Sequence, residues 1–289
     1  MNSKLRQHVL TPYAFLGPSV VILGVFFLAA MVQVLYYSFT RYTAFDPPEW
    51  VGLDNYRRLL ASDRFWICLL NTGAYLLVTP VLMALSLGAA MVIESGLKWA
   101  KGLRLVLFLP VVTPTIVAAV AWTAMLRQDD GLINAALRGI GLEGVGWLTE
   151  RPWTLVSAML VTLWKGFGFY MMIFLAGLMS VPKELKEAAS LDGAGRLGVF
   201  RHVVLPALWP VLTLVFIVSS ISALKVFEEL YVTVKGTPIE HQTVVPLIYT
   251  TAFEKGEYGM ASAIGITLFV IILAFSLVNL RLSQKREDA

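Results

Sequence analysis

Residues 187–206 read EAASLDGAGRLGVFRHVVLP, and this polar stretch connects two long apolar runs, residues 152–181 and 203–224. Each run is long enough to cross the hydrocarbon core of a bilayer as a helix, which takes about 20 apolar residues. Charged side chains are costly inside that core, so the polar stretch belongs outside it. The sequence therefore predicts a short polar element on the surface of a membrane protein.

Composition supports the membrane assignment for the whole chain. Of its 289 residues, 57% are hydrophobic and only 15% are charged, whereas soluble domains carry roughly a quarter charged residues. Helices are expected because a backbone in lipid must satisfy its own hydrogen bonds, and the runs are too long and too continuously apolar for barrel strands. We predict an all-α, polytopic fold in one transmembrane domain, residues 1–289, with six spans at about 12–40, 65–93, 105–126, 152–181, 203–224 and 258–280.

The distribution of charge predicts the orientation. An even number of spans puts both termini on one side. The N-terminus, the 94–104 and 182–202 loops and the C-terminus together hold twelve Lys and Arg residues. The opposite loops, 41–64, 127–151 and 225–257, hold ten Lys and Arg residues together with thirteen acidic residues. Short basic loops remain in the cytoplasm, so both termini are expected inside. The net charge of +4 is explained by this partition and does not indicate nucleic acid.

Proline is expected to bend two of the spans. Pro110 and Pro114 lie in the third apolar run and Pro80 lies in the second. A proline inside a helix removes one backbone hydrogen bond and kinks the chain.

The polar element itself is predicted to form a helix of about nine residues. Pro182 suits a first helical turn and Ser180 can cap it, while Gly193 can adopt the left-handed conformation that ends a helix. Small and acidic side chains then lie on or near one face: Leu185, Ala188, Ala189 and Asp192, with Glu187 at the edge. The pattern alone fits either a docking surface for another protein or an amphipathic connector at the membrane surface.

A family resemblance favours docking. EAASLDGAG, followed by Phe200 and the pair Leu205–Pro206, resembles the EAA signature of permease subunits in binding-protein-dependent ABC importers. Residues 11–45, 51–72 and the stretch WKGFGFYMMIFLAGLMSVPKELKEAA resemble the sugar-uptake permeases of that family. KGTPIE at 235–240 departs from the Gly-Gly-Pro turn of many relatives. The positions that match the signature are Glu187, Ala188, Ala189 and Gly193, and Asp192 fits its sugar-type version.

The resemblance implies a mechanism and a set of partners. The helix at 187–193 would be a cytoplasmic coupling helix seated in a cleft of an ATPase subunit, within a permease core of about 65–281. A second, similar permease, two copies of the ATPase and an external solute-binding protein would complete the importer. The sequence contains no GxxxxGK[ST] phosphate loop, so ATP and Mg²⁺ are expected on the partner ATPase, with no cofactor in this chain.

One ionisable residue, Lys165, is predicted deep within the spans. A charged side chain inside the bilayer costs free energy unless it faces a water-filled cavity or a partner. Two roles explain Lys165 equally well: a place in the translocation path, or a structural contact to helix carbonyls. Aromatic rings and polar side chains suit sugar binding, although aromatic residues in membrane helices more often serve packing. The candidate path residues are Trp122, Trp164, Lys165, Tyr170 and Asn71.

Catalysis and metal binding are not indicated. The chain has one cysteine, Cys68, and its three histidines fall in separate segments, so no spacing suggests a catalytic pair or a metal site. Two alternatives to a carbohydrate permease remain: an ABC permease for peptides, amino acids or phosphate esters, and an ion-coupled secondary transporter. Such carriers commonly place Asp, Glu or His in the membrane, and the six predicted spans contain none.

Overall fold

The computed structural model describes residues 15–96, 99–234 and 238–287. Within these ranges the chain is almost wholly helical, and its two strands have two residues each. The predicted all-α fold is therefore confirmed. The chain divides into two compact units: residues 1–62 with 248–269, and residues 63–247 with 270–289.

The first unit joins the N-terminal apolar helix to a small polar cap. A π-helical stretch, η1 (Gly24–Leu28), continues into α2 (Ala29–Ser38), and then β1 (Thr40–Arg41) pairs antiparallel with β2 (Glu49–Trp50) before α3 (Asp54–Leu60). Asn55 fastens α3 to the end of α2, because its Nδ2 donates to the carbonyl oxygens of Ser38 (3.0 Å) and Thr40 (2.8 Å). The π-helical turn η4 (Thr250–Glu254) and the first part of α16 (Tyr258–Glu287) complete the unit.

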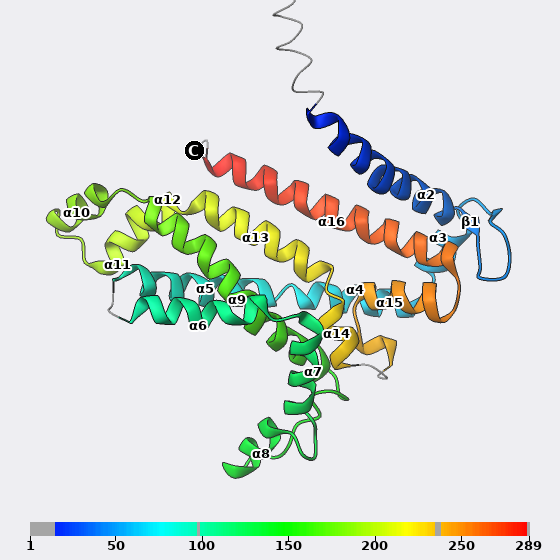
Figure 1. Cartoon of the computed structure of the whole chain (residues 1–289), viewed down its shortest axis with the longest axis horizontal. Coiled ribbons are helices and arrows are strands. Elements are labelled where there is room, and N and C mark those ends of the chain that lie inside the picture. Colours follow the sequence, from blue (N-terminus) through cyan, green and yellow to red (C-terminus); the bar gives the residue numbers. More distant parts are fainter. Residues whose placement is uncertain (1–14, 97–98, 235–237, 288–289) are drawn as a thin grey trace, which may run out of the picture. The chain divides into compact units, whose positions relative to one another are not determined.

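The second unit holds most of the helices (Figure 1). Its elements are α4 (Asp63–Tyr75), α5 (Val78–Glu94), α6 (Ala100–Val112), α7 (Thr115–Met125), α8 (Leu132–Gly139), α9 (Trp153–Ser180), α10 (Lys183–Leu191), α11 (Arg196–Val199), η2 (Phe200–Val204), α12 (Leu205–Ala207), α13 (Trp209–Leu224), α14 (Glu228–Thr233) and η3 (Ile239–His241). The short helix α15 (Val244–Tyr249), up to Leu247, and the last part of α16 (from Val270) follow.

Helix α9 lies at the centre of the second unit and packs mainly against α5 and α6. The core around it is built from large apolar side chains such as Met171, Phe174 and Leu208, which are fully buried. Gly168 allows α6 to approach closely, because a Cβ atom at this position would lie 2.2 Å from the carbonyl oxygen of Leu107. Small residues serve this purpose in membrane helices generally, since they let two backbones touch.

Four helices are long and apolar enough to cross a membrane: Phe15–Ser38, Asp63–Glu94, Trp153–Ser180 and Tyr258–Ser283. Two further apolar runs are bent pairs, so the described chain has up to six spans if each pair counts as one. The third and fifth apolar runs are therefore not straight helices, although the sequence analysis treats each as a single span.

Proline explains both sharp bends. The third run breaks between α6 and α7, whose axes differ by 98°, because Thr113, the residue before Pro114, adopts the extended conformation (ψ 128°) that a following proline favours. Pro110 lies inside α6 without ending it. The fifth run bends by 68° at Leu208, two residues before Pro210, which cannot donate a hydrogen bond back to Pro206.

Pro80 has a milder effect on the second run. It lies in the first turn of α5, where a missing N–H costs little. The carbonyl of Leu76 receives the N–H of Thr79 instead (3.0 Å), and α4 ends at Tyr75. The run is interrupted there but still passes as one span, Asp63–Glu94.

Candidate functional site

Helix α10 is the short polar helix that the sequence predicts between the fourth and fifth apolar runs. It has nine residues and begins directly after Pro182, whose extended ψ of 133° sets the entry. The prediction that Ser180 caps it is wrong, because the Ser180 hydroxyl donates to the Gly177 carbonyl (2.7 Å) within α9. Val181 and Pro182 adopt extended conformations between the two helices, and no side chain caps the start of α10.

Gly193 terminates α10 as expected. Its φ of +87° is the left-handed conformation that glycine adopts without steric cost. Its N–H donates to the Ser190 carbonyl (3.2 Å), and the N–H of Ala194 donates to the Ala189 carbonyl (3.0 Å). This pair of bonds is a Schellman motif, which satisfies the last carbonyls of a helix. The end of α10 is thus fixed by backbone geometry.

The side chains of α10 face outward. Glu187, Ala188 and Asp192 are exposed, Ala189 is half-buried, and none of the nine helical residues is buried. Leu191, at the end of the helix, is 89% exposed. Exposed apolar residues beside small and acidic ones are typical of a surface that another protein covers.

An ion pair fastens this exposed helix to the bundle. Lys186 Nζ lies 2.8 Å from Glu94 Oε1 at the C-terminal end of α5, and both side chains are partly exposed. Because α9 spans 28 residues, at about 1.5 Å per residue it places α10 roughly 42 Å from Trp153. Helix α10 thus sits at one end of the second unit, as Figure 1 shows.

A polar cavity lies between α5, α9, α13 and α14. It has a volume of about 310 Å³ and contains two of the predicted path residues, Lys165 and Tyr170. The ammonium of Lys165 donates to the hydroxyl of Thr115, the first residue of α7. The break in the third apolar run therefore presents a hydroxyl to the one lysine within α9.

The cavity also contains Glu229, which the sequence analysis does not single out. Glu229 is the second residue of α14, a helix that packs against α7 and α9. Burial raises the pKa of the Glu229 carboxyl above its ordinary value, and Glu228 adds to this, whereas a backbone hydrogen bond and Lys165 act in the opposite direction. The signal in the sequence is an acidic pair between Phe227 and Leu230, in a segment otherwise assigned to an outer loop.

The two predicted tryptophans lie together but outside the lining of this cavity. Trp122 of α7 and Trp164 of α9 form an edge-to-face pair with ring centroids 6.2 Å apart. Neither ring is among the residues that line the cavity. Their contact joins α7 to α9, which is a packing role.

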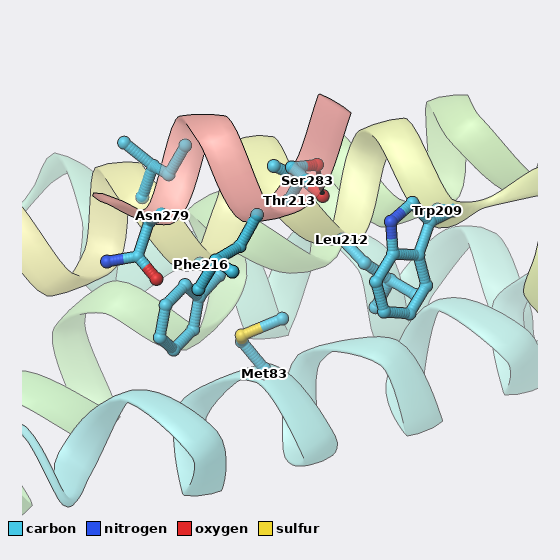
Figure 2. Close-up of a pocket in the computed structure, with 9 residues that line it drawn as sticks. Met83, Trp209, Leu212, Thr213, Phe216, Asn279 and Ser283 are labelled. Atoms are coloured by element: carbon cyan, nitrogen blue, oxygen red, sulfur yellow. Dashed lines mark hydrogen bonds between the residues drawn. The ribbon is translucent and has the colours of Figure 1, made fainter. Parts of the chain in front are cut away.

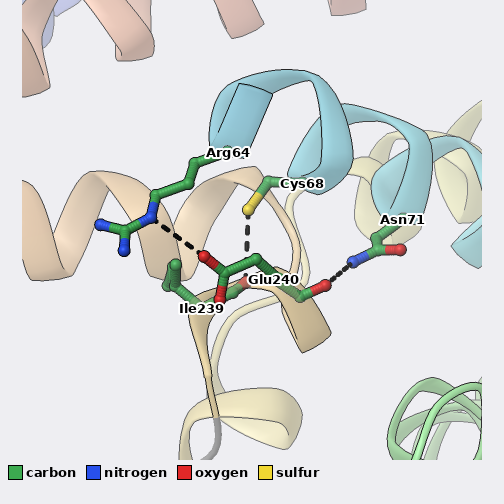
Figure 3. Close-up of polar contacts among 5 residues, drawn as sticks. All are labelled: Arg64, Cys68, Asn71, Ile239 and Glu240. Atoms are coloured by element: carbon green, nitrogen blue, oxygen red, sulfur yellow. Dashed lines mark hydrogen bonds and ion pairs between the residues drawn. The ribbon is translucent and has the colours of Figure 1, made fainter. Parts of the chain in front are cut away.

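Asn71 has a structural role instead of lining the cavity. It is 3% exposed, and its Nδ2 donates to the carbonyl oxygens of Glu240 (2.9 Å) and Gln242 (2.8 Å). Its Oδ1 accepts from Arg151 Nη2 (2.9 Å). Figure 3 shows Asn71 on one side of η3, with Arg64 bound to the Glu240 carboxylate and Cys68 to the Ile239 carbonyl. The amide nitrogen and oxygen of Asn71 are thus both engaged in these structural hydrogen bonds, and its place in the path stays a prediction.

A second and larger cavity, about 450 Å³, lies between α5, α13 and the end of α16 (Figure 2). Its lining is mainly apolar, with Met83, Leu212 and Phe216 among its walls. The hydroxyls of Thr213 and Ser283 bond to each other across α13 and α16 (2.7 Å). Since the described residues that line it are all uncharged, this cavity offers less to a polar solute than the cavity around Lys165.

Comparison with known proteins identifies the family. A family model described as "Binding-protein-dependent transport system inner membrane component" matches residues 81–288. The trehalose/maltose transport system permease protein MalF of Thermococcus litoralis is 32% identical over 291 residues, with 100% of this chain and 99% of the relative covered. The arabinooligosaccharides transport system permease protein AraP of Bacillus subtilis is 34% identical over 282 residues, covering 94% and 88%.

A solved structure shares the fold. One chain of a bacterial ABC transporter involved in the import of the acidic polysaccharide alginate superposes with a TM-score of 0.85 at 24% identity, over 97% of this chain and 96% of that one. The family match covers α5 to α16, which includes the exposed helix α10 and the cavity around Lys165. The chain belongs to the family of binding-protein-dependent transport system inner membrane components.

Proposed function

We propose that the chain is one of two permease subunits of an ATP-driven importer and forms half of the path by which a carbohydrate crosses the plasma membrane. An external binding protein delivers the solute, and two copies of a cytoplasmic ATPase supply the energy, with ATP and Mg²⁺ bound there. The support for a carbohydrate comes from relatives with 32% and 34% identity, which are named for trehalose and maltose and for arabinooligosaccharides.

Helix α10 carries the proposal, since it is the element that can transmit force. None of its nine residues is buried, its C-terminal end is fixed by the left-handed Gly193, and Lys186 links it to α5. A partner that moves α10 therefore also moves α5, which packs along α9. We assign Glu187, Ala188, Ala189, Asp192 and Gly193 to ATPase coupling. Nucleotide binding in the partner then biases the permease between two states through their different contacts with α10.

The solute path is assigned to the cavity around Lys165 and Tyr170. Aromatic faces and hydrogen-bonding groups meet there, and the volume is at the lower end of the range for small-molecule sites. Tyr170 and Phe169 form an edge-to-face pair (5.2 Å between centroids) on the same wall. The aromatic pair offers apolar surface to a sugar ring, and Lys165 offers a donor to its hydroxyls.

The coupling assignment is tested with Ala188→Leu, and Ser190→Leu is the matched control. Both positions are exposed on α10, but successive helix positions differ by about 100°, so they lie on nearly opposite faces. In proteoliposomes that contain the full transporter and its binding protein, Ala188→Leu should lower ATP-driven uptake at least about tenfold, which corresponds to 1.4 kcal/mol. ATP hydrolysis should persist, and Ser190→Leu should remain close to wild type. Normal uptake by Ala188→Leu would refute the coupling assignment.

An ion-coupled carrier is the second candidate, because Glu229 places a half-buried carboxylate in the cavity. Carboxylates in such positions commonly relay protons in carriers. Uptake that follows a proton gradient in ATP-depleted vesicles would favour this candidate. Family membership favours the ATP-driven importer.

A further inference from the structure

Two side chains of opposite charge share the cavity. Lys165 comes from α9 and Glu229 from α14, and the other described residues that line the cavity are uncharged. The two residues are 64 positions apart in sequence, and α14 brings them together because it packs against α9. The cavity thus has one cationic and one acidic group and little net charge.

Among the described residues, Lys165 and Glu229 do not form an ion pair with each other. In the part of the chain that the structure describes, the ion pairs within 4.0 Å are Arg64–Glu240, Arg127–Asp130 and Lys186–Glu94. Lys165 donates to Thr115, and an ammonium has three donors in total. The Lys165 ammonium therefore retains donors, and the Glu229 carboxylate retains acceptor sites, for a solute in the cavity.

The chemistry of this arrangement suits hydroxyl groups. A hydroxyl accepts a hydrogen bond from an ammonium and donates one to a carboxylate, so a solute with several hydroxyls can satisfy both. The aromatic pair Phe169 and Tyr170 supplies an apolar surface for a ring face. A solute with its own carboxylate would instead bring a negative charge towards Glu229, and like charges close together are costly. An amine would meet the same difficulty at Lys165.

We propose that Glu229 and Lys165 act together as a charge filter that selects uncharged, hydroxyl-rich solutes, with Glu229 as the residue that excludes acidic sugars. This rests on the proposed function, in which the cavity belongs to the solute path. It assigns a specificity role to Glu229, a residue of α14 outside the apolar spans. It also separates this cavity from one built for an acidic saccharide, for which a carboxylate in the wall would be a disadvantage.

The variant Glu229→Gln tests the filter, since it removes the negative charge and preserves the shape of the side chain. Glu228→Gln is the matched control, because Glu228 is the adjacent carboxylate of the same helix but is exposed and does not line the cavity. Lys165→Gln gives the opposite perturbation. Each variant is prepared in the complete transporter and checked for assembly by size-exclusion chromatography.

The measurement is direct binding of neutral and acidic disaccharides to the purified transporter without its binding protein, so that only the permease selects. The neutral probes are maltose, trehalose and arabinobiose, and the acidic probe is digalacturonate. Wild type should bind at least one neutral probe more tightly than digalacturonate. In Glu229→Gln the ratio of the two dissociation constants should shift by about tenfold or more towards digalacturonate. Lys165→Gln should shift it the other way, and Glu228→Gln should leave it unchanged.

The inference is overturned if wild type prefers digalacturonate, if it binds none of the four probes, or if Glu229→Gln leaves the ratio within about twofold of wild type. ATP-driven uptake in proteoliposomes separates this failure from failure of the proposed function. If Glu229→Gln shows ATP-driven uptake with an unchanged charge preference, the charge-filter proposal is refuted and the importer proposal stands. If the complete transporter shows no ATP-driven uptake of any of these solutes, the importer proposal itself is refuted.

Discussion

The side chain of Asn71, a polar residue in the largely apolar helix α4, is engaged in hydrogen bonds to other segments of the chain. Its amide joins α4 to the segment around η3 through two donated bonds and accepts one from Arg151. Thr72, its neighbour, receives the N–H of Val244 (3.0 Å). Together with Arg64 and Cys68, these residues hold the backbone at 239–244 against α4. Buried polar groups need such partners, because an unpaired one costs about 1–3 kcal/mol.

Replacing Asn71 should therefore destabilise the protein without changing its solute preference. We expect Asn71→Ala to lower the free energy of unfolding by about 2–3 kcal/mol, since the carbonyls of Glu240 and Gln242 lose their donor. Asn279→Ala is the control, because Asn279 makes a single bond to the Phe275 carbonyl of its own helix. Thermal unfolding in detergent gives the stabilities. A stable Asn71→Ala with altered solute preference would instead place Asn71 in the path.

At the residue scale, the sequence predicted the sites that a local pattern encodes. Gly193 and the exposed residues of α10 follow from the EAA stretch and its glycine, and Lys165 follows from its isolation in an apolar run. Asn71 and Glu229 could not be assigned in this way, because their roles depend on partners that are distant in sequence. Asn71 binds residues about 170 positions away, and Glu229 reaches Lys165's cavity only through the packing of α14.

At the element scale, the apolar runs predict which segments are helical but not where each helix breaks. Pro114 ends α6 and Pro110 does not, although each proline lacks the N–H that an interior residue of a helix donates. The difference is set by the neighbours of each helix. Close packing of α6 against α9 at Gly168 retains α6 as a helix through Pro110, and the Lys165–Thr115 bond holds the start of α7 beyond the break.

Among the glycines of α9, Gly168 is accordingly the least able to accept a side chain. A Cβ at 168 would lie 2.2 Å from the Leu107 carbonyl oxygen and 2.9 Å from Phe108 Cα, and both are backbone atoms that cannot rotate away. We expect Gly168→Ala to destabilise the protein by about 1–3 kcal/mol, as overpacking does, despite the better helix propensity of alanine.

Gly166→Ala is the matched control for this prediction. It adds the same methyl group two residues away on the same helix, where the nearest atom, in the Tyr170 ring, would be at an ordinary 3.5 Å. Alanine favours the helix over glycine by about 1 kcal/mol, so Gly166→Ala should be neutral or stabilising. The comparison uses thermal unfolding of both variants in one detergent. Equal effects of the two substitutions would contradict the close approach of α6 to α9.

At the scale of the whole molecule, charge and helix direction favour one orientation. Helix α9 begins at Trp153, near the loop that carries α8, and ends at Ser180, where α10 follows. The α10 side is the side with the excess of Lys and Arg in short segments. Such segments stay in the cytoplasm, and the proposed coupling to an ATPase requires α10 on that side too. We therefore propose that α10 and both termini lie in the cytoplasm.

Site-directed labelling tests this orientation. Cys68, the single native cysteine, is buried, so wild type should react little with a membrane-impermeant maleimide. Ser190→Cys on α10 and Ala289→Cys at the C-terminus should label in inside-out vesicles only, because both are expected on the cytoplasmic face. Glu143→Cys, exposed in the segment before α9, should label in right-side-out vesicles only. Labelling of Ser190→Cys from the outside would place α10 beyond the reach of any cytoplasmic ATPase, and the proposed coupling could not then operate.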